Sequence, residues 1–382
     1  MRVSTGDASG AVADLGVLVP LVAALVLVNG LRVGSILVAA GALVLAAGIG
    51  FRLPFPVQPL KALTALAVAQ ALPAEVIHAA GLQVGLVLVL LAVTGLADRL
   101  AKVFTKPVIR SLQFAVGTLL VVAAVRLAAD PPSVFAGSPS RPISLALTVL
   151  TLAAVGVAAW RRWYAAGAGM LAIGVAVTWM ATSPDFGTFR PQLPQFVAPD
   201  FGVFATAFVL LVIPQIPLTY GNAVVGVTDL AREHFGPRAS RVTEGRVAAS
   251  SGFANIVSAL IGGMPMCHGS SGLSAHIRLG ASTAAMSVML GGSFLVLGVL
   301  FPGQVLALFA LLPVWVLAGF LAYAGVRHAM LVLDLRGARL ALALAAGAVG
   351  IVTGNLAYTT AVALIVEHGT RRARQPAYAA EG

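Results

Sequence analysis

The sequence predicts an all-α protein that crosses a membrane many times and contains two half-helices inside the bilayer. Hydrophobic residues make up 59% of the 382 residues and charged residues only 10%, a composition that no soluble domain of this length could hide from water. Two of the many apolar runs directly follow segments broken by proline or glycine. Irregular backbone at membrane depth persists only where protein buries it or where it lines a wet cavity. Paired breaks in the two halves of a chain are typical of a transporter's substrate site.

Apolar windows predict about fourteen membrane elements, several of them shorter than the ~20 residues that a full span needs. They cover about 8–28, 33–50, 57–72, 75–97, 107–129, 142–160, 164–181, 201–220, 246–262, 270–281, 283–301, 304–326, 337–352 and 354–367. The elements that begin near residues 57 and 270 follow the broken segments. We therefore predict that these two are half-helices, each preceded by a short extended segment.

The order of the elements predicts an inverted repeat. Seven elements in each half would enter the membrane from opposite sides, because seven is odd. Residues 14–20 in the first element resemble residues 213–218 in the eighth, and each stretch precedes a broken segment by two elements. The alternative to this 7+7 arrangement is a bundle of about ten or twelve helices.

The net charge of +11 indicates membrane topology rather than nucleic-acid binding, because the basic residues lie in short clusters between apolar runs. Most of the 24 lysines and arginines lie at the N-terminus or in alternate loops. This pattern predicts an inner-membrane protein with both termini in the cytoplasm. Cys267 is the only cysteine, which excludes intrachain disulfides and C-x-x-C metal motifs. We expect membrane lipid around the chain, no nucleic-acid partner and no cofactor.

The two broken segments, residues 54–61 and 262–272, carry groups suited to an anion. A helix that begins in mid-membrane leaves N–H groups unpaired and carries about half a positive charge at its start. Gly269 lets the backbone approach a ligand closely, and Ser270 and Ser271 add hydroxyl donors. Two such helix starts that face each other predict a cradle for a tetrahedral oxyanion.

Lys61 lies in the first turn of the first half-helix, where the helix dipole and desolvation both oppose a cation. A negative group should compensate it, and the choice is between a bound anion and an acid from a neighbouring element. Asp14 lies inside the first apolar run and is the candidate for coupling transport to protons. Its alternative role is to pair with Lys61 or with free backbone groups.

Four further polar residues at membrane depth are candidates for binding substrate. Gln58 and Gln215 each stand beside a proline, so each could donate to an anion or satisfy backbone that the proline frees. Asn222 is the third candidate. His268 could donate to substrate, titrate near neutrality or stabilise its own turn. A nucleophilic Cys267–His268 pair is not expected, because adjacent side chains project in different directions and no acid completes a triad. The chain is therefore predicted not to be an enzyme.

Four blocks of sequence resemble the molybdate transporters allied to the sulfate permeases. They are Val12-Ala-Asp-Leu-Gly16 with Pro20, Pro56-Val-Gln-Pro-Leu-Lys61, Pro214-Gln-Ile-Pro-Leu-Thr-Tyr-Gly-Asn-Ala-Val, and Gly263-Met-Pro-Met-Cys-His-Gly-Ser-Ser-Gly-Leu-Ser. The resemblance implies molybdate uptake on a fold similar to that of uracil permease and the sulfate permeases. Substrate would lie between the starts of the two half-helices, among motif residues that include Gln58, Lys61, Gln215, Asn222, His268 and Ser270.

The resemblance also implies a core domain that moves against a gate domain. The core would comprise residues 1–105 and 200–301, the gate residues 106–182 and 302–368, and a short cytoplasmic tail residues 369–382. One departure is Ser270-Ser271, where a smaller glycine or alanine pair is expected, which leaves the width of the pocket open. The alternatives are a permease for sulfate or another oxyanion, an anion channel on the same scaffold and a nucleobase permease. The chain could also use a proton as co-substrate and could form a homodimer.

Overall fold

The computed structural model describes residues 4–11, 15–96, 103–131, 135, 138–161, 166–182 and 188–374. Its first half contains α1 (Thr5–Ala11), α2 (Leu15–Leu27), α3 (Val33–Phe51), β1 (Gln58–Pro59), α4 (Lys61–Ala69), α5 (Ala74–Thr94), α7 (Lys106–Ala129), α8 (Arg141–Trp160) and α9 (Ala166–Thr182). The second half opens with η1 (Phe201–Val203), α10 (Phe204–Ala207), η2 (Phe208–Val212), α11 (Ile213–Leu218), η3 (Thr219–Val225), α12 (Gly226–Phe235), η4 (Gly236–Arg241) and α13 (Glu244–Leu260). It continues with β2 (Met266–Cys267), α14 (Ser270–Arg278), α15 (Ala285–Leu300), α16 (Pro302–Ala310), α17 (Val314–Ala329), η5 (Met330–Asp334), α18 (Gly337–Thr353) and α19 (Leu356–Arg374).

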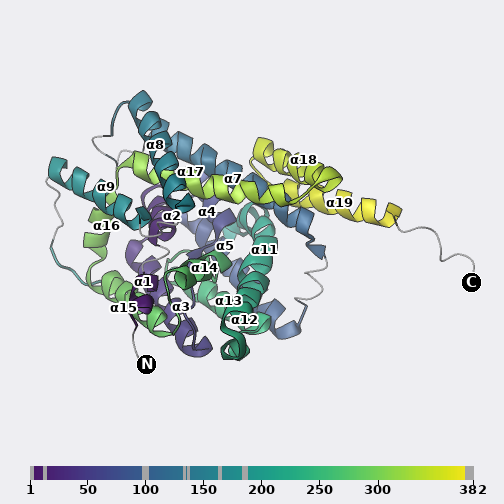
Figure 1. Cartoon of the computed structure of the whole chain (residues 1–382), viewed down its shortest axis with the longest axis horizontal. Coiled ribbons are helices and arrows are strands. Elements are labelled where there is room, and N and C mark those ends of the chain that lie inside the picture. The colour runs from purple at the N-terminus through teal and green to yellow at the C-terminus, as the bar shows by residue number, and fades with distance from the viewer. Residues whose placement is uncertain are drawn as a thin grey trace, which may run out of the picture.

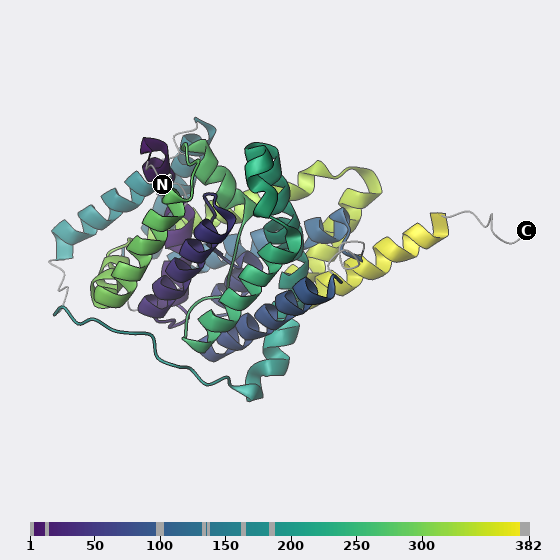
Figure 2. The ribbon, with the colours of Figure 1, turned by 90° about the horizontal axis from the view of Figure 1, so that it is seen from below.

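The helices gather in two groups on opposite sides of the molecule (Figure 1). α7, α8, α17, α18 and α19 lie along one side, whereas α3, α12, α13, α14 and α15 lie along the other. The extended segment over residues 188–200 runs along the edge of the molecule toward η1 (Figure 2). The short helix α4 lies inside this assembly, flanked by longer helices (Figure 1), and its residues from Ala62 to Val68 are buried.

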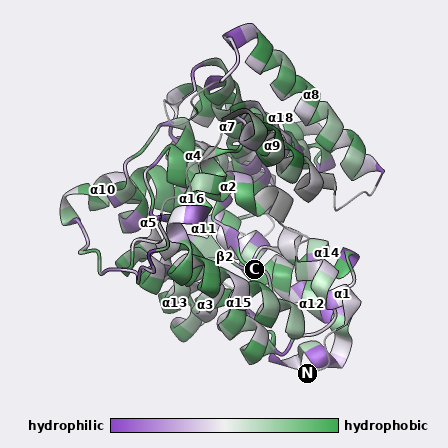
Figure 3. Cartoon of the chain, turned by 90° about the vertical axis from the view of Figure 1, so that its left-hand side faces the viewer, coloured by the Kyte–Doolittle hydropathy of each residue, from purple (hydrophilic) through white to green (hydrophobic). Residues whose placement is uncertain are grey.

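Six helical segments among the described residues are long and apolar enough to cross a membrane. α15 and α16 make a seventh if they are one span, although the axis bends by 99° between them. Hydrophobic residues cover most of helices such as α5 and α8 (Figure 3). These features confirm the prediction of an integral, all-α membrane protein.

Facing glycines bring two pairs of long helices into close contact. α5 packs along α13 and α3 along α15. A Cβ added to Gly85 would lie 2.8 Å from the Gly252 carbonyl oxygen, and one added to Gly41 would lie 2.8 Å from the Gly291 carbonyl oxygen. Small residues allow this close backbone approach, which is how helices in lipid gain packing energy without a hydrophobic driving force.

The predicted half-helices and their extended lead-in segments are confirmed. α4 and α14 are nine residues long, about 14 Å at 1.5 Å per residue, which is half of a bilayer core. β1 and β2 precede them and pair antiparallel, with Gln58 opposite Cys267 and Pro59 opposite Met266. Gln58 of β1 is extended because a proline biases the residue before it away from the helical region, and Pro59 follows it.

Four predicted elements have different boundaries in the structure, and the last of them, predicted to end at residue 367, continues as α19 to Arg374. The first contains two helices, α1 and α2, separated by residues 12–14, which lie outside the described residues. The eighth continues beyond residue 220 to Arg241 and passes through two π-helical segments, η2 and η3. Pro214 and Pro217 remove helical N–H donors there, and π segments accommodate such losses. The twelfth divides into α16 and α17, because Pro313 precedes α17 and ends the helix before it.

Candidate functional site

The starts of α4 and α14 meet at one buried position because β1 and β2 pair. Besides the strand register, the Leu60 backbone nitrogen donates to the Pro265 carbonyl oxygen over 3.0 Å. Helices behind the strands hold both breaks in place. Asn255 of α13 donates to the Met266 carbonyl oxygen and accepts from its nitrogen (2.7 and 2.9 Å), and Ser287 of α15 accepts from the Phe55 nitrogen (2.9 Å). The first turns of the two half-helices therefore converge.

Lys61 joins the two broken segments directly. Its Nζ donates to Ser271 Oγ over 2.7 Å, and Ser271 Oγ donates to Gln58 Oε1 over 3.1 Å. Lys61 is half-buried and Ser271 is exposed, whereas Gln58 is buried. These two bonds hold the Lys61 ammonium, which belongs to the first turn of α4, against the start of α14.

Gly269 leaves space for the Gln58 side chain. A Cβ at residue 269 would collide with the Gln58 side-chain oxygen, although the backbone angle there (φ −74°) suits any residue. The glycine is therefore needed for space rather than for conformation. It lets the Gln58 amide pass the start of α14 and reach Ser271.

Ser270 and Asn222 link α14 to the π-helical segment η3. Ser270 Oγ donates to Asn222 Oδ1 over 2.6 Å. This bond occupies the acceptor of the Asn222 amide and orients the side chain, so its nitrogen is the donor left for other partners. Both residues are half-buried.

Gln215 caps the first turn of α4. Its Oε1 accepts from the Leu63 backbone nitrogen over 2.9 Å, and its Nε2 donates to Thr219 Oγ1 over 2.8 Å. The side chain is only 2% exposed. Of the two roles that the sequence left open for Gln215, this geometry supplies the bond to freed backbone.

His268 is fully buried, and both ring nitrogens have protein partners. Nδ1 lies 2.8 Å from the Pro56 carbonyl oxygen, and Nε2 lies 3.0 Å from Ser250 Oγ. The carbonyl only accepts, so Nδ1 carries the hydrogen in the neutral ring. The Phe55 ring meets the imidazole edge-on at a centroid distance of 4.9 Å. His268 therefore holds the turn before α14 against the first broken segment.

A small pocket opens beside these residues. Four of the predicted substrate-binding residues line it, namely Gln58, Lys61, Gln215 and Asn222. Gly269, Ser270 and Ser271 do not line it but contact residues that do, whereas His268 is bonded to Pro56 and Ser250 outside the lining. The pocket volume is about 20 Å³, enough for about one water molecule. A tetrahedral oxyanion therefore requires the pocket walls to move apart.

Two pocket residues, Gln113 of α7 and His328 of α17, were missed by sequence reasoning. Gln113 is a polar residue in the middle of an apolar run, and this signal could have identified it. His328 follows the predicted end of the twelfth element at residue 326 and adjoins Arg327, so the sequence predicts that it belongs to a basic loop. In the structure α17 continues to Ala329 and brings His328 into the lining of the pocket.

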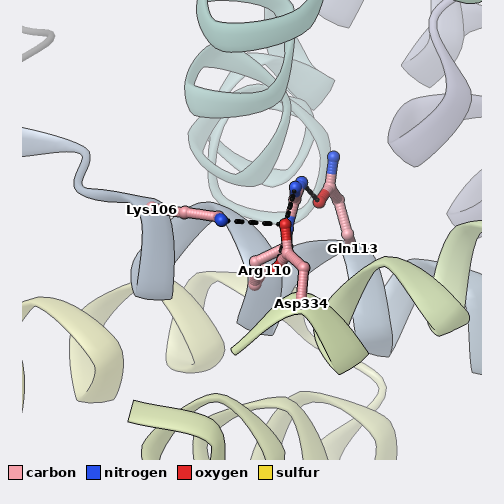
Figure 4. A network of polar contacts seen from close by, with 4 residues as sticks. All are labelled: Lys106, Arg110, Gln113 and Asp334. Atoms are coloured by element: carbon pink, nitrogen blue, oxygen red, sulfur yellow. Dashed lines mark hydrogen bonds and ion pairs between the residues drawn. The ribbon is translucent and has the colours of Figure 1, made fainter. Parts of the chain in front are cut away.

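An ion-pair network lies next to Gln113 (Figure 4). Arg110 makes two bonds to the Asp334 carboxylate, of 2.9 and 2.5 Å, and a third to Gln113 Oε1 of 2.6 Å. Lys106 adds a second cation 2.9 Å from Asp334. Asp334 belongs to η5 after α17, so the network fastens the beginning of α7 to the end of α17.

The predicted coupling residue Asp14 lies outside the described residues. Within the described ranges no group of three or more His, Cys, Asp or Glu side chains could hold a metal ion. The donors at the helix starts are N–H, amide and hydroxyl groups together with one ammonium. This set suits an oxyanion.

Comparisons with known proteins place the chain in a family. The family model "Molybdate transporter of MFS superfamily" matches residues 6–120 and 207–327. Molybdate transporter 2 of Arabidopsis thaliana is 26% identical over 317 residues, which cover 72% of this chain and 68% of that protein.

Solved structures share the fold. The transmembrane domain of the cyanobacterium bicarbonate transporter BicA superposes with a TM-score of 0.64 at 17% identity, over 94% of this chain and 97% of that one. The anion transporter SLC26A9 gives a TM-score of 0.68 at 13% identity, over 96% of this chain and 65% of that one. The prediction of a fold of the uracil-permease and sulfate-permease type is therefore confirmed. The relatives are transporters rather than enzymes, and this chain is a member of the molybdate transporter family.

Proposed function

We propose that the chain imports molybdate across the inner membrane and binds it between the starts of α4 and α14. The observation that carries this proposal is the pairing of β1 with β2, which brings two helix starts and Lys61 to one position. Helix dipoles, backbone N–H groups and an ammonium together favour a dianion. The family and the relative from Arabidopsis support molybdate as that dianion.

The transport step is a displacement of the core, residues 1–105 and 200–301, against the gate, residues 106–182 and 302–368. The small pocket supports this division, because its lining comes from both parts and it must widen to admit an oxyanion. The helix packing supports an inverted repeat. The repeat would exchange α3 with α13 and α5 with α15, and these four helices form the pairs α3–α15 and α5–α13.

Coupling to a cation is part of the proposal. A dianion that enters against the membrane potential meets about 2.3 kcal/mol per charge per 100 mV, or roughly 4.6 kcal/mol in total. A co-transported proton offsets part of this energy. Asp14 is the candidate carrier, and Asp14→Asn should change the pH dependence of uptake more than the affinity.

The test is uptake of labelled molybdate and labelled sulfate into proteoliposomes, with and without an inward proton gradient. We expect saturable molybdate uptake that exceeds sulfate uptake and rises with the gradient. Preference for sulfate would reassign the substrate to another oxyanion. Non-saturating currents in planar bilayers would indicate a channel, and tight uracil binding would indicate a nucleobase permease. Indifference to both oxyanions would refute the proposal.

A further inference from the structure

The pocket beside Lys61 has a second wall that the half-helices do not supply. Gln113 of α7 and His328 of α17 form it. These two helices pack along each other, and both lie in the segments proposed as the gate. Lys61 and Gln58, opposite them, lie in the segments proposed as the core.

Gln113 offers its amide nitrogen to the pocket because its oxygen is already bonded. Arg110 donates to Gln113 Oε1, and since a guanidinium carries only donors, the atom that faces it must be the oxygen. The Gln113 nitrogen points away from Arg110 (Figure 4) and has no hydrogen bond within the described part of the chain. Gln113 is 5% exposed. An amide N–H of a buried side chain that lines a polar pocket calls for an acceptor.

His328 Nε2 is buried and lacks a hydrogen-bond partner among the described residues. Lys61 lines the same pocket as His328, and Arg110 is bonded to Gln113 of that wall. None of the described residues that line the pocket is acidic. A negatively charged oxygen is therefore a group that would complete this environment, because it accepts from an imidazole N–H and is attracted by the Lys61 ammonium.

We propose that Gln113 and His328 are gate-side ligands of the transported oxyanion, each donating an N–H to an oxygen that the half-helix starts leave uncovered. The inference rests on the proposed function, since it names further ligands of the same site. A tetrahedral anion presents oxygens in opposing directions, so donors on two facing walls can bind it at once. The bound anion would then bridge core and gate.

The test is calorimetric titration of the purified full chain with sodium molybdate and, in a separate series, with sodium sulfate. His328→Leu removes the imidazole donors. Gln113→Glu keeps an oxygen for Arg110 but replaces the amide nitrogen with a carboxylate oxygen. His78→Leu is the matched control, because His78 Nε2 is also buried without a partner in the described ranges but lines a different pocket, next to Glu75 and Leu260.

We expect His328→Leu and Gln113→Glu to weaken oxyanion binding about tenfold or more, because each loses a hydrogen bond to a charged group. His78→Leu should bind within about twofold of the wild type. Gln113→Glu should not lower the melting temperature, since the carboxylate still accepts from Arg110. This variant therefore decides the matter if His328→Leu fails to fold.

Near-wild-type affinity in both His328→Leu and Gln113→Glu would overturn the inference. Equal losses in His328→Leu and His78→Leu would also overturn it, because they would reflect the removal of any buried histidine. If the wild type binds sulfate but not molybdate, the molybdate assignment fails and the sulfate series decides on the two ligands. If it binds neither anion, both proposals fall.

Discussion

Lys61→Met tests whether the positive charge at the start of α4 binds substrate. Methionine keeps most of the length of the side chain but removes the ammonium and its bond to Ser271. Desolvation and the helix dipole both oppose the lysine charge at this position. Removal of the charge should therefore leave the melting temperature of the substrate-free protein unchanged or slightly higher.

The loss of affinity can be bounded from the position of Lys61. A hydrogen bond to a charged group contributes about 1.5–3 kcal/mol. Two unit charges about 4 Å apart attract by about 4 kcal/mol at an effective dielectric constant of ~20. Lys61 is half-buried, which favours the lower part of this range. We expect molybdate to bind Lys61→Met about 30- to 100-fold more weakly, equivalent to about 2–2.7 kcal/mol.

Titration calorimetry of the wild type, Lys61→Met and Lys61→Arg provides the measurement. Lys61→Arg retains the charge and should keep most of the affinity, although its planar fork cannot reproduce the ammonium geometry. A dissociation constant for Lys61→Met within about twofold of the wild-type value would refute the reasoning. A lower melting temperature together with that value would assign Lys61 to a structural ion pair.

Three further substitutions test the surroundings of the site. Gly269→Ala should place a methyl group against Gln58 Oε1 and weaken molybdate binding by about 1–3 kcal/mol, measured by titration. In the Gln58→Ala background, Gly269→Ala should weaken molybdate binding little further. Gln215→Leu should lower the free energy of unfolding by about 1–3 kcal/mol, because the Leu63 N–H loses its buried acceptor. Gln215→Glu keeps that acceptor and should preserve the melting temperature; a drop equal to that of Gln215→Leu would contradict the capping role. Asp7 is buried, which raises the pKa of its carboxyl, but hydrogen bonds from Ser282 and Thr283 lower this pKa to about 2. Since the folded-state pKa lies below the usual value near 3.9, the carboxylate stabilises the fold above about pH 4 and this contribution disappears as the pH falls toward 2. Asp7→Asn should therefore lower the free energy of unfolding at pH 7 by about 1–2 kcal/mol, measured as a lower melting temperature. The difference in melting temperature between Asp7→Asn and the wild type should shrink as the pH falls.

The half-helices could be predicted from the sequence because their signals are local. Prolines at 54, 56 and 59 and glycines at 262, 263 and 269 break apolar runs that otherwise continue. Membrane physics then limits where such breaks can lie. The facing of the two helix starts follows from strand pairing over only two residues each, which no local pattern records. It was reached through the inverted order of elements rather than from the strands themselves.

The roles of single polar residues were harder to predict, because composition does not reveal which partner a side chain meets. Gln58 and Gln215 both stand beside prolines in broken helices, yet Gln58 accepts from Ser271 whereas Gln215 caps α4. His268 has the residue type of a ligand, but Pro56 and Ser250 bond to both of its nitrogens. These partners lie far away in the sequence. Only the folded chain separates a binding group from a supporting one.

The pocket wall formed by Gln113 and His328 belongs to α7 and α17, and these two helices are held together at two places along their length. Gly117 and Gly325 let α7 and α17 approach closely, since a Cβ at residue 325 would lie 2.6 Å from the Gly117 carbonyl oxygen. At the other place, Arg110 of α7 is fastened to Asp334 just after α17. Gln113 and His328 lie between these contacts along the chain, so their spacing should persist if the proposed gate moves as a unit. Under the proposed displacement of core against gate, the separation that changes is then the one between this pair and Lys61. An oxyanion that binds all three would favour the state in which that separation is smallest.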